Sequence, residues 1–439
     1  MPNLDENSFL GFKQYLYSKT VPNDQLDAAI MAGIHKAKQE KKKHTFWMKL
    51  SVSTAALLLL FFVVLRTSDT FADYVSAIPG LEKVVELVRG DKGLVSVIQN
   101  DYAQKINVSD SHKGIKVTLD SIILDQEQLV LFYSFQSDKK ESGEVSVKNL
   151  ALERPNGQKV ELGSWTVGGE NASLKGKSRL YSNPIGLMSP IKDKNLTLVM
   201  TLEGPKSLDL NKTVWRIPFK INQQKIGSKR TVAIHKTVTV DQQRITVKSI
   251  TTSPTQIGVT VNFSKGNSKQ IFDLEDLRLV DEHNQIWGRR KEGVVSAGGD
   301  QEKTFYLQSN YFEKPKKLYL EFNLIRALDK DELLVRVDPL HQKILKSPRD
   351  GRILNVVMNP VDLPGYLQLN VKHQGWHRQL FNQYTDGAGK VHAIQSFMDT
   401  NDSVAFPYSL TEPDAKKPIT LKLLDYPSYI SGNVKIRIK

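Results

Sequence analysis

The residues of this chain that could support chemistry are scattered histidines, a few neighbouring carboxylates and one glycine-rich stretch that ends in lysine. That stretch, Asp386 to Lys390 (DGAGK), is the nearest approach to a phosphate-binding loop. It lacks the earlier glycine and the following Ser or Thr of such a loop, so a hairpin turn with glycine at positive φ is predicted instead. The sequence contains no GxSxG, HExxH or GxGxxG motif.

The nine histidines show no metal-ligand pattern. His373 and His377 lie four residues apart, but the Gln-Gly-Trp between them suits a loop and not a metal-binding helix. We interpret each histidine as an ordinary surface or core residue. The same holds for three that stand in separate strand or turn contexts: His235, His283 and His392.

Close carboxylates occur at Asp273, Glu275 and Asp276, but they flank a turn-like stretch, and nothing in the sequence places a substrate between them. The chain has no cysteine, which excludes disulfides, thiolate metal sites and cysteine nucleophiles together. We therefore expect no enzymatic activity, no catalytic or metal-binding residues and no cofactor.

The longest apolar run of the chain, Phe46 to Leu65, follows a cluster of lysines that ends at Lys43. Twenty residues of helix at ~1.5 Å each span about 30 Å, the hydrocarbon thickness of a bilayer. Acidic Asp69 and Asp73 follow the run, so the positive-inside rule places residues 1–45 in the cytoplasm. We predict a transmembrane helix over residues 46–66 of a single-pass cell-membrane protein whose C-terminal domains are extracellular.

A cleaved signal peptide and a buried core helix are the alternatives for this run. The 45 residues before it are too many for the charged head of a signal peptide. A core helix would carry polar residues at helical spacing, and the run has none after Thr54. A cut after Ala72 stays open as a second interpretation.

Residues 1–45 contain two amphipathic helical patterns, Glu6 to Ser18 and a second that begins near Pro22 and ends in lysines. So short a segment can hardly enclose a core, so its apolar stripes must pack on each other, on the membrane or on a partner protein. We predict a partner-binding hairpin; a hairpin that only stabilises the anchor is the alternative. The candidate partner-binding residues are Phe9, Phe12, Leu16, Leu26, Ile30 and Ile34.

The net charge of +14 falls mostly after the predicted span, because residues 1–45 hold seven lysines against five acidic residues and so account for only +2. A basic outer part would be attracted to anionic wall polymers or lipid headgroups. Its basic residues are scattered, however, so a charged surface that only maintains solubility is an equal interpretation. We expect no nucleic-acid partner.

After the predicted span, the pattern changes from helical to extended. Leu81, Val84, Val85 and Val88 share one side of a predicted juxtamembrane helical region. From Gly114 onward, short alternating runs are broken by Gly, Asn, Asp and Pro, which is typical of β-strands. The outer part is therefore predicted to be mainly β.

Two segments of this β region repeat at a spacing of 128 residues. VTLDSI, which ends at Ile122, recurs as ITVKSI, which ends at Ile250, and Gln128 matches Gln256. Phe135 and Phe263 continue the match at the same spacing. The repeat predicts two copies of one immunoglobulin-like sandwich.

A third, diverged copy is predicted from weaker alternation after residue 340, beginning with the strand pattern from Tyr366 to Val371. The predicted fold is a mainly β ectodomain of tandem immunoglobulin-like sandwiches with a short α-helical cytoplasmic segment and one transmembrane helix. The predicted division is 1–45 cytoplasmic helices, 46–66 transmembrane helix, 67–105 juxtamembrane helical region, 106–225 first sandwich, 226–340 second sandwich and 341–439 third β domain.

Residues 71–94, FADYVSAIPGLEKVVELVRGDKGL, and 114–135, GIKVTLDSIILDQEQLVLFYSF, resemble a domain of unknown function. In Bacillus and its relatives this domain follows the membrane span of anti-sigma factors, which are negative effectors of extracytoplasmic-function sigma factors. The resemblance covers about residues 69–225, and residues 226–340 look like a companion domain. LDAAIMAGIHKAKQEKKK, from Leu26 to Lys43, is also similar to the end of the family's cytoplasmic stretch.

This resemblance implies that the cytoplasmic helices hold a sigma factor at the membrane while the outer domains respond to envelope stress. A partner groove that accepts an apolar helix face would be the physical basis. Another membrane protein is a further candidate partner. Two alternatives remain: a membrane-anchored envelope protein whose sandwiches bind wall polymer or another surface protein, and, more remotely, a secreted hydrolase.

Overall fold

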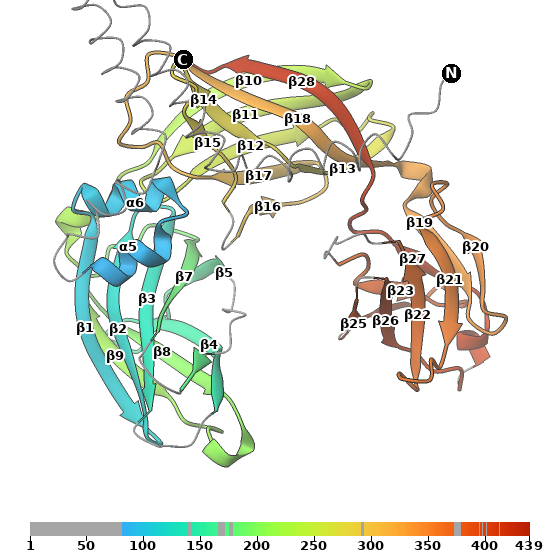
Figure 1. Cartoon of the computed structure of the whole chain (residues 1–439), viewed down its shortest axis with the longest axis horizontal. Helices are drawn as coiled ribbons and strands as arrows, with labels where there is room; N and C mark the ends of the chain where they lie inside the picture. Colours follow the sequence, from blue (N-terminus) through green and yellow to red (C-terminus); the bar gives the residue numbers. More distant parts are fainter. Residues whose placement is uncertain are drawn as a thin grey trace, which may run out of the picture. The chain divides into compact units, whose positions relative to one another are not determined.

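The computed structural model describes residues 81–137, 143–165, 172–174, 179–290, 294–372, 379–394, 396, 398–400, 402–411 and 413–439. The predicted cytoplasmic helices and transmembrane helix lie outside these residues, as do His373 and His377. No helix in the described part is long and apolar enough to cross a membrane. The described residues are mainly β and belong to one compact unit, which confirms the mainly β prediction (Figure 1).

The first sandwich packs a sheet of order β1-β2-β3-β7-β5 against a sheet of order β6-β4-β8-β9. Alternate residues of the strands point into the shared core, as the alternating sequence pattern requires. Trp215 is fully buried there, and its indole nitrogen donates a hydrogen bond to the Ile115 carbonyl (3.0 Å). The strands are β1 (Ala103–His112), β2 (Ile115–Leu124), β3 (Gln128–Ser137), β4 (Glu144–Glu153), β5 (Leu162–Trp165), β6 (Ala172–Ser173), β7 (Leu180–Leu187), β8 (Asn195–Glu203) and β9 (Trp215–Lys220).

The second sandwich repeats this arrangement with a sheet of order β10-β11-β12-β17-β16 and a sheet of order β13-β18-β14-β15. The last strand of the chain, β28 (Tyr429–Arg437), also pairs with β18. The remaining strands are β10 (Arg230–Val240), β11 (Gln243–Thr252), β12 (Ile257–Phe263), β13 (Lys269–Leu274), β14 (Arg278–Asp281), β15 (Ile286–Trp287), β16 (Ser296–Gly298), β17 (Glu302–Leu307) and β18 (Leu318–Asp329).

The third sandwich packs a sheet of order β20-β19-β27-β23-β24 on a sheet of order β21-β22-β26-β25. Its strands are β19 (Leu334–Asp338), β20 (Lys343–Lys346), β21 (Ile353–Met358), β22 (Tyr366–Val371), β23 (Gln383–Thr385), β24 (Val391–Ala393), β25 (Met398–Asp399), β26 (Ser403–Pro407) and β27 (Ile419–Lys422). Short 3-10 helices lie in the connections: η1 (Lys206–Leu208), η2 (Gln223–Lys225), η3 (Lys330–Glu332) and η4 (Pro413–Lys416).

The structure confirms the predicted 128-residue repeat, and the two copies also share the same β-bulges. Ile122 pairs with Leu131 in the first copy, and Ile250 pairs with Val259 in the second. Both copies have a bulge at the same place in the second strand. Both also place a residue at positive φ in the bulge of the first strand, Asn107 in one and His235 in the other. The repeat therefore preserves backbone geometry as well as apolar pattern.

The predicted bounds of the third domain, 341–439, are wrong at both ends. The third sandwich already begins at β19, and β28 belongs to the second sandwich. Figure 1 shows β28, in red, alongside β18. In the first sandwich β9 occupies the equivalent place beside β8, so β28 is the last strand of the second copy. The third sandwich is thus an insertion within the second, which alternation along the sequence alone does not reveal.

The predicted hairpin turn at DGAGK is confirmed. It joins β23 to β24, with Gly389 at a φ of +87°. The Asp386 carboxylate accepts hydrogen bonds from the backbone of Ala388 and Lys390 (2.9 Å each) and contacts the His392 ring (2.7 Å). These bonds define a turn and not a phosphate cradle.

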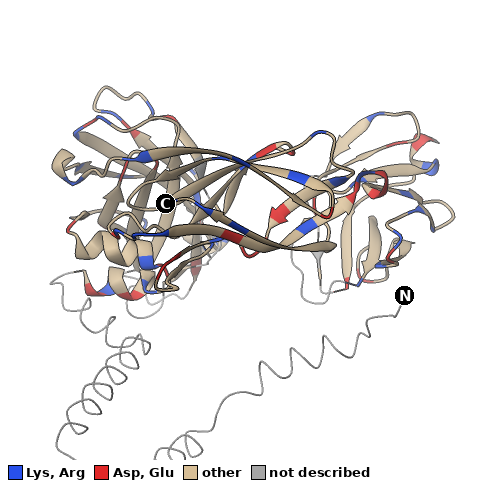
Figure 2. Cartoon of the chain, turned by 90° about the horizontal axis from the view of Figure 1, so that it is seen from above, with Lys and Arg blue, Asp and Glu red and all other residues tan. Residues whose placement is uncertain are grey.

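Basic residues do not gather into one block on the described strands. Figure 2 shows Lys and Arg separated by Asp, Glu and uncharged residues. Several of them form ion pairs, as at Lys248 and Glu302 (2.7 Å). This distribution favours the interpretation of the charge as a solvated surface.

If β28 completes the second sandwich, a cavity at its buried Ile436 should destabilise that sandwich although Ile436 lies beyond the third one in the sequence. We expect Ile436→Ala to cost about 2–5 kcal/mol. Limited proteolysis with mass spectrometry should find new cleavages within β10–β18. Val391→Ala, at an exposed position of the third sandwich, is the control and should change stability by less than about 0.5 kcal/mol. New cleavages confined to β19–β27 would contradict the assignment.

Candidate functional site

The six predicted partner-binding residues lie outside the described residues, so their prediction stays untested: Phe9, Phe12, Leu16, Leu26, Ile30 and Ile34. The described part offers a different candidate, a junction where a helical hairpin meets the first two sandwiches. The hairpin consists of α5 (Glu82–Val88) and α6 (Lys92–Gln99). It lies within the predicted juxtamembrane region.

Local sequence explains why two short helices form here. The carboxylate of Asp91 caps α6 by accepting hydrogen bonds from the backbone of Gly93 (3.0 Å) and Leu94 (3.2 Å). Helices of seven and eight residues are too short to be stable alone, so tertiary packing must hold them. The apolar side predicted from Leu81, Val84, Val85 and Val88 is buried, as expected.

The apolar side of the hairpin packs on the outer face of the first sandwich. This face of a sandwich sheet is normally polar, but here Ile123, Val130 and Phe132 point outward and are buried beneath the helices. The strands β2 and β3 are therefore apolar on both faces. Their unbroken apolar runs, Ile122 to Leu124 and Leu129 to Phe132, are the sequence counterpart of this double burial.

The turn of the hairpin and the start of α6 dock on the second sandwich through three neighbouring contacts. The side-chain nitrogen of Gln308 donates to the Gly90 carbonyl (2.9 Å), and the Asp91 carboxylate pairs with Arg290 (3.4 Å). At Gly93 the helix comes so close that an added Cβ would lie 2.5 Å from the Ser309 nitrogen. The hairpin is thus attached to both sandwiches at once.

Arg290 is the centre of the junction. Its side chain is only 3% exposed. Its Nη1 donates to the side-chain oxygens of Gln128 (3.0 Å) and Gln256 (3.1 Å), and Gln128 also donates to Gln256 (3.3 Å). These two glutamines are the matching residues of the 128-residue repeat. Arg290 therefore connects the hairpin with both copies of the sandwich.

A second contact joins the two sandwiches directly. Asp125 follows β2, and one of its carboxylate oxygens accepts hydrogen bonds from the Thr255 backbone (2.9 Å) and hydroxyl (2.7 Å). Its other oxygen accepts from the backbone of Glu127 (2.8 Å) and Gln128 (2.9 Å). This buried carboxylate accepts four hydrogen bonds. It thereby fixes the turn between β2 and β3 against the equivalent turn between β11 and β12.

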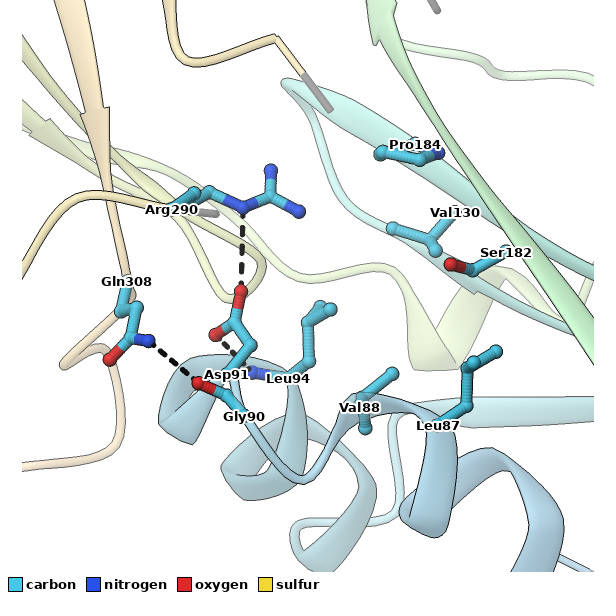
Figure 3. A pocket seen from close by; sticks show the side chains of 10 residues that line it. All are labelled: Leu87, Val88, Gly90, Asp91, Leu94, Val130, Ser182, Pro184, Arg290 and Gln308. Atoms are coloured by element: carbon cyan, nitrogen blue, oxygen red, sulfur yellow. Dashed lines mark hydrogen bonds and ion pairs between the residues drawn. The ribbon is translucent and has the colours of Figure 1, made fainter. Parts of the chain in front are cut away.

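A cavity of about 70 Å³ lies between the hairpin and the two sandwiches (Figure 3). Figure 3 shows the guanidinium end of Arg290 directed into it, across from Val130, Ser182 and Pro184 of the first sandwich. The other lining residues are Leu87, Val88, Gly90, Asp91, Leu94 and Gln308. The cavity has room for a few water molecules and not for an organic substrate.

Burial changes the proton affinity of the acidic groups in the junction. It raises the pKa of the Asp91 carboxyl, against the opposing effects of the Arg290 charge and the Gly93 and Leu94 amides. It also raises the pKa of Asp125, against the four hydrogen bonds that this residue accepts. Asp91 is engaged by Arg290 and Asp125 by four hydrogen-bond donors, so both carboxylates serve to attach the parts of the junction to each other.

The carboxylates singled out in the sequence have structural partners elsewhere. Asp273 pairs with Arg289 and Arg326, and Glu275 also pairs with Arg326. Asp276 accepts bonds from two backbone amides at the bulge of β18 (2.7 and 2.9 Å). Within the described ranges, no three His, Asp or Glu side chains are grouped so as to hold a metal ion.

Sequence reasoning did not identify the junction as a site. Asp91 stood in the 71–94 segment that carries the family resemblance and the glutamines marked the repeat, but neither feature indicated a contact. Arg290 follows Gln128 by 162 residues, and no local pattern connects them. The signal that could have found the junction is the pair of identical glutamines at equivalent buried positions, since glutamine is seldom buried without a specific partner.

Comparison with known proteins adds two family matches and one similar structure. Residues 42–137 match a domain of unknown function (DUF4179), and residues 229–346 match a family of unknown function (DUF5643). The crystal structure of a conserved domain protein from Bacillus anthracis is similar over 56% of this chain and 84% of that one, with 14% sequence identity and a TM-score of 0.34. The comparison with curated proteins finds no match.

The close approach at Gly93 predicts a specific steric effect. Gly93→Ala places a methyl group against the backbone of Ser309, which cannot move as a flexible side chain could. We expect the hairpin to lose its contact with the second sandwich, with faster amide hydrogen exchange in α6. Gly90→Ala is the matched control, because a Cβ there meets nothing within 4 Å. Equal exchange in the two variants would exclude a tight contact at Gly93.

The buried ion pair of Asp91 and Arg290 predicts a measurable coupling. Asp91→Asn and Arg290→Met should each destabilise the attachment of the hairpin, since each leaves a buried polar or charged group without its partner. The double variant should cost less than the sum, with a coupling of about 1–3 kcal/mol in the protection of α5 and α6 amides. The exposed pair of Lys113 and Asp209 (3.2 Å) should couple by less than about 1 kcal/mol. Additive effects at Asp91 and Arg290 would show that the pair does not hold the hairpin.

Proposed function

We propose that this protein is a single-pass membrane regulator that sequesters an extracytoplasmic-function sigma factor through its cytoplasmic helices. In this proposal its outer sandwiches control the release of the sigma factor. The observation that carries the proposal is the attachment of α5 and α6 to both of the first two sandwiches. These helices follow the predicted transmembrane helix, so a change in the sandwiches would reach the membrane segment through them first.

The family matches support this organisation. The segment that matches the domain of unknown function starts at residue 42, so it includes the predicted transmembrane helix, the hairpin and the first three strands of the sandwich. A single family segment that covers both the predicted transmembrane helix and the docked hairpin favours a structural connection between them. The resemblance to anti-sigma factors of Bacillus, given by the sequence motifs, supplies the role of the cytoplasmic end.

A release mechanism needs two states that differ in free energy, and the hairpin junction could supply them. The contacts at Gly90, Asp91 and Gly93 lie close together in the sequence, at the hairpin turn and the start of α6, so they can form or break together. A signal that binds one state of the junction more tightly would shift the population toward that state. Proteolysis of a detached hairpin, or a movement passed to the membrane helix, would then free the sigma factor.

The cytoplasmic half of the proposal is tested by substitutions on the predicted apolar stripes. Phe12→Ala combined with Ile30→Ala should release the sigma factor and make its regulon constitutively expressed, because apolar anchors at the centre of an interface carry most of its affinity. Gln14→Ala combined with Gln25→Ala, on the opposite side of the predicted helices, is the matched control and should leave transcription unchanged. Transcript levels measured by RNA sequencing give the readout.

Protein capture provides the complementary measurement. Full-length protein solubilised from membranes should bring down a sigma factor, and the chain lacking residues 1–44 should not. Recovery of wall material or surface proteins with both chains, and of a sigma factor with neither, would exclude the regulator and favour an anchored envelope protein.

A further inference from the structure

A polar depression of about 150 Å³ lies on the outer face of the second sandwich, distinct from the cavity at the hairpin. Gly258 on β12 is one of its lining residues, and the side chains of Thr304 and Tyr306 lie close beside it. The neighbouring residues are mostly hydroxyl-bearing. The lining consists of Glu127, Thr251, Ser253, Gln256, Gly258, Thr260, Thr304 and Tyr306.

The hydroxyl groups of the depression are held in place by cross-strand pairs. Thr260 and Thr304 lie 3.1 Å apart, oxygen to oxygen, and Thr251 is paired with Thr231 at 3.0 Å. A hydroxyl has one donor and two acceptor positions, so each retains capacity for a further bond. Burial and the nearby Glu127 charge raise the pKa of the Tyr306 phenol, which therefore stays protonated and able to donate.

Gln256 presents a hydrogen-bond donor at this place. The side chain is 5% exposed, and its oxygen accepts bonds from both Arg290 and Gln128. Two donors on that oxygen identify the other terminal atom as the amide nitrogen, which has no partner among the described residues. This nitrogen is not among the buried polar atoms of the described residues that lack a partner, so it is open to the depression, where a ligand oxygen can accept its hydrogen bond.

The one negative charge in the lining of the depression is paired with a neighbouring lysine. Glu127, from the first sandwich, is the one charged group in the lining, and its carboxylate pairs with Lys229 (2.6 Å). That bond uses one carboxylate oxygen and leaves the other able to accept hydroxyl hydrogens. A cation would compete with Lys229 and an anion would be repelled by Glu127, so an uncharged ligand fits best.

We propose that this depression binds a neutral carbohydrate, one sugar ring at a time. The lining offers a carboxylate that accepts, an amide that donates, several hydroxyls that do both and one aromatic ring. Neighbouring hydroxyls of a sugar supply donors and acceptors in the same mixture. The site is shallow and small, so it would take one unit of a longer glycan. This inference does not depend on the sigma-factor proposal.

The test uses the full-length protein in lipid nanodiscs, titrated with methyl glucoside and N-acetylglucosamine by saturation-transfer NMR. Saturable binding of a neutral sugar is expected, with weaker binding of glucuronate and glucosamine, which carry opposite charges. Glu127→Gln and Thr260→Val should each weaken binding of the neutral sugar at least tenfold.

Thr246→Val is the matched control. Thr246 pairs with Thr237 across the same sheet (2.8 Å), as Thr260 does with Thr304, but it does not line the depression. Both changes keep a β-branched residue on a strand, so both variants should fold, and their thermal unfolding should coincide. Thr246→Val should alter affinity by less than twofold. Absence of saturable binding, affinity unchanged by Thr260→Val, an equal loss with Thr246→Val or a preference for a charged sugar would each overturn the proposal.

Discussion

The buried guanidinium of Arg290 is the constraint around which the described junction is organised. A cation that is 3% exposed has lost its hydration, so the surrounding residues must replace it. Asp91 supplies the opposite charge from the helical hairpin, Gln128 an acceptor from the first sandwich and Gln256 another from the second. Removal of any one of these partners would leave the buried guanidinium with fewer interactions and so raise the free energy of the whole junction. The hairpin and two sandwiches are thereby held in one arrangement more strictly than apolar packing alone would achieve, because apolar contacts have no preferred direction.

A second buried guanidinium, that of Arg326, has the same role at the place where the third sandwich is inserted. Arg326 lies on β18, just before the chain leaves for that sandwich, and Asp425 lies just before it returns on β28. The two pair at 2.6 Å, and Asp273 completes the cluster from β13 at 3.2 Å. The outgoing and returning strands of the insertion are therefore tied to each other and to the parent sheet. These two joints within the described residues thus use an arginine surrounded by acceptors, whereas the three sandwich cores are apolar.

The fold was largely predictable from the sequence, for a physical reason that also limits the prediction. Alternation of apolar residues determines which face of a strand is buried, so strands such as β2, β11 and β22 follow from sequence. A repeat of 128 residues reveals two copies because each copy must bury the same pattern. Alternation does not determine which strand pairs with which, and β28 was therefore assigned to the wrong sandwich. The double burial of β2 and β3 left a trace in the sequence, namely runs such as Ile122 to Leu124 without polar interruption.

The candidate site was less predictable, because polar junctions have no periodicity. Asp91 belonged to the segment that carries the family resemblance and Gln128 marked the repeat, but their contact with Arg290 depends on three-dimensional proximity alone. The predicted partner-binding residues rest on a helical stripe in residues that the structure does not describe. Sequence therefore predicts well what depends on local pattern, and poorly what depends on the meeting of distant segments.

Gln256 gives the two polar sites a physical connection. Its side-chain oxygen accepts from Arg290 at the hairpin junction, and its side-chain nitrogen belongs to the depression proposed for carbohydrate. A ligand that orders the nitrogen also orders the oxygen, because both belong to one planar amide. If the ligand binds more tightly when the hairpin is attached, the hairpin is attached more tightly when the ligand is bound. The two effects are equal, because coupling between two binding equilibria is reciprocal. The coupling can act in either direction, and Arg290 and Asp91 lie on its path, because they are among the residues that join the sandwiches to the helices nearest the predicted membrane span.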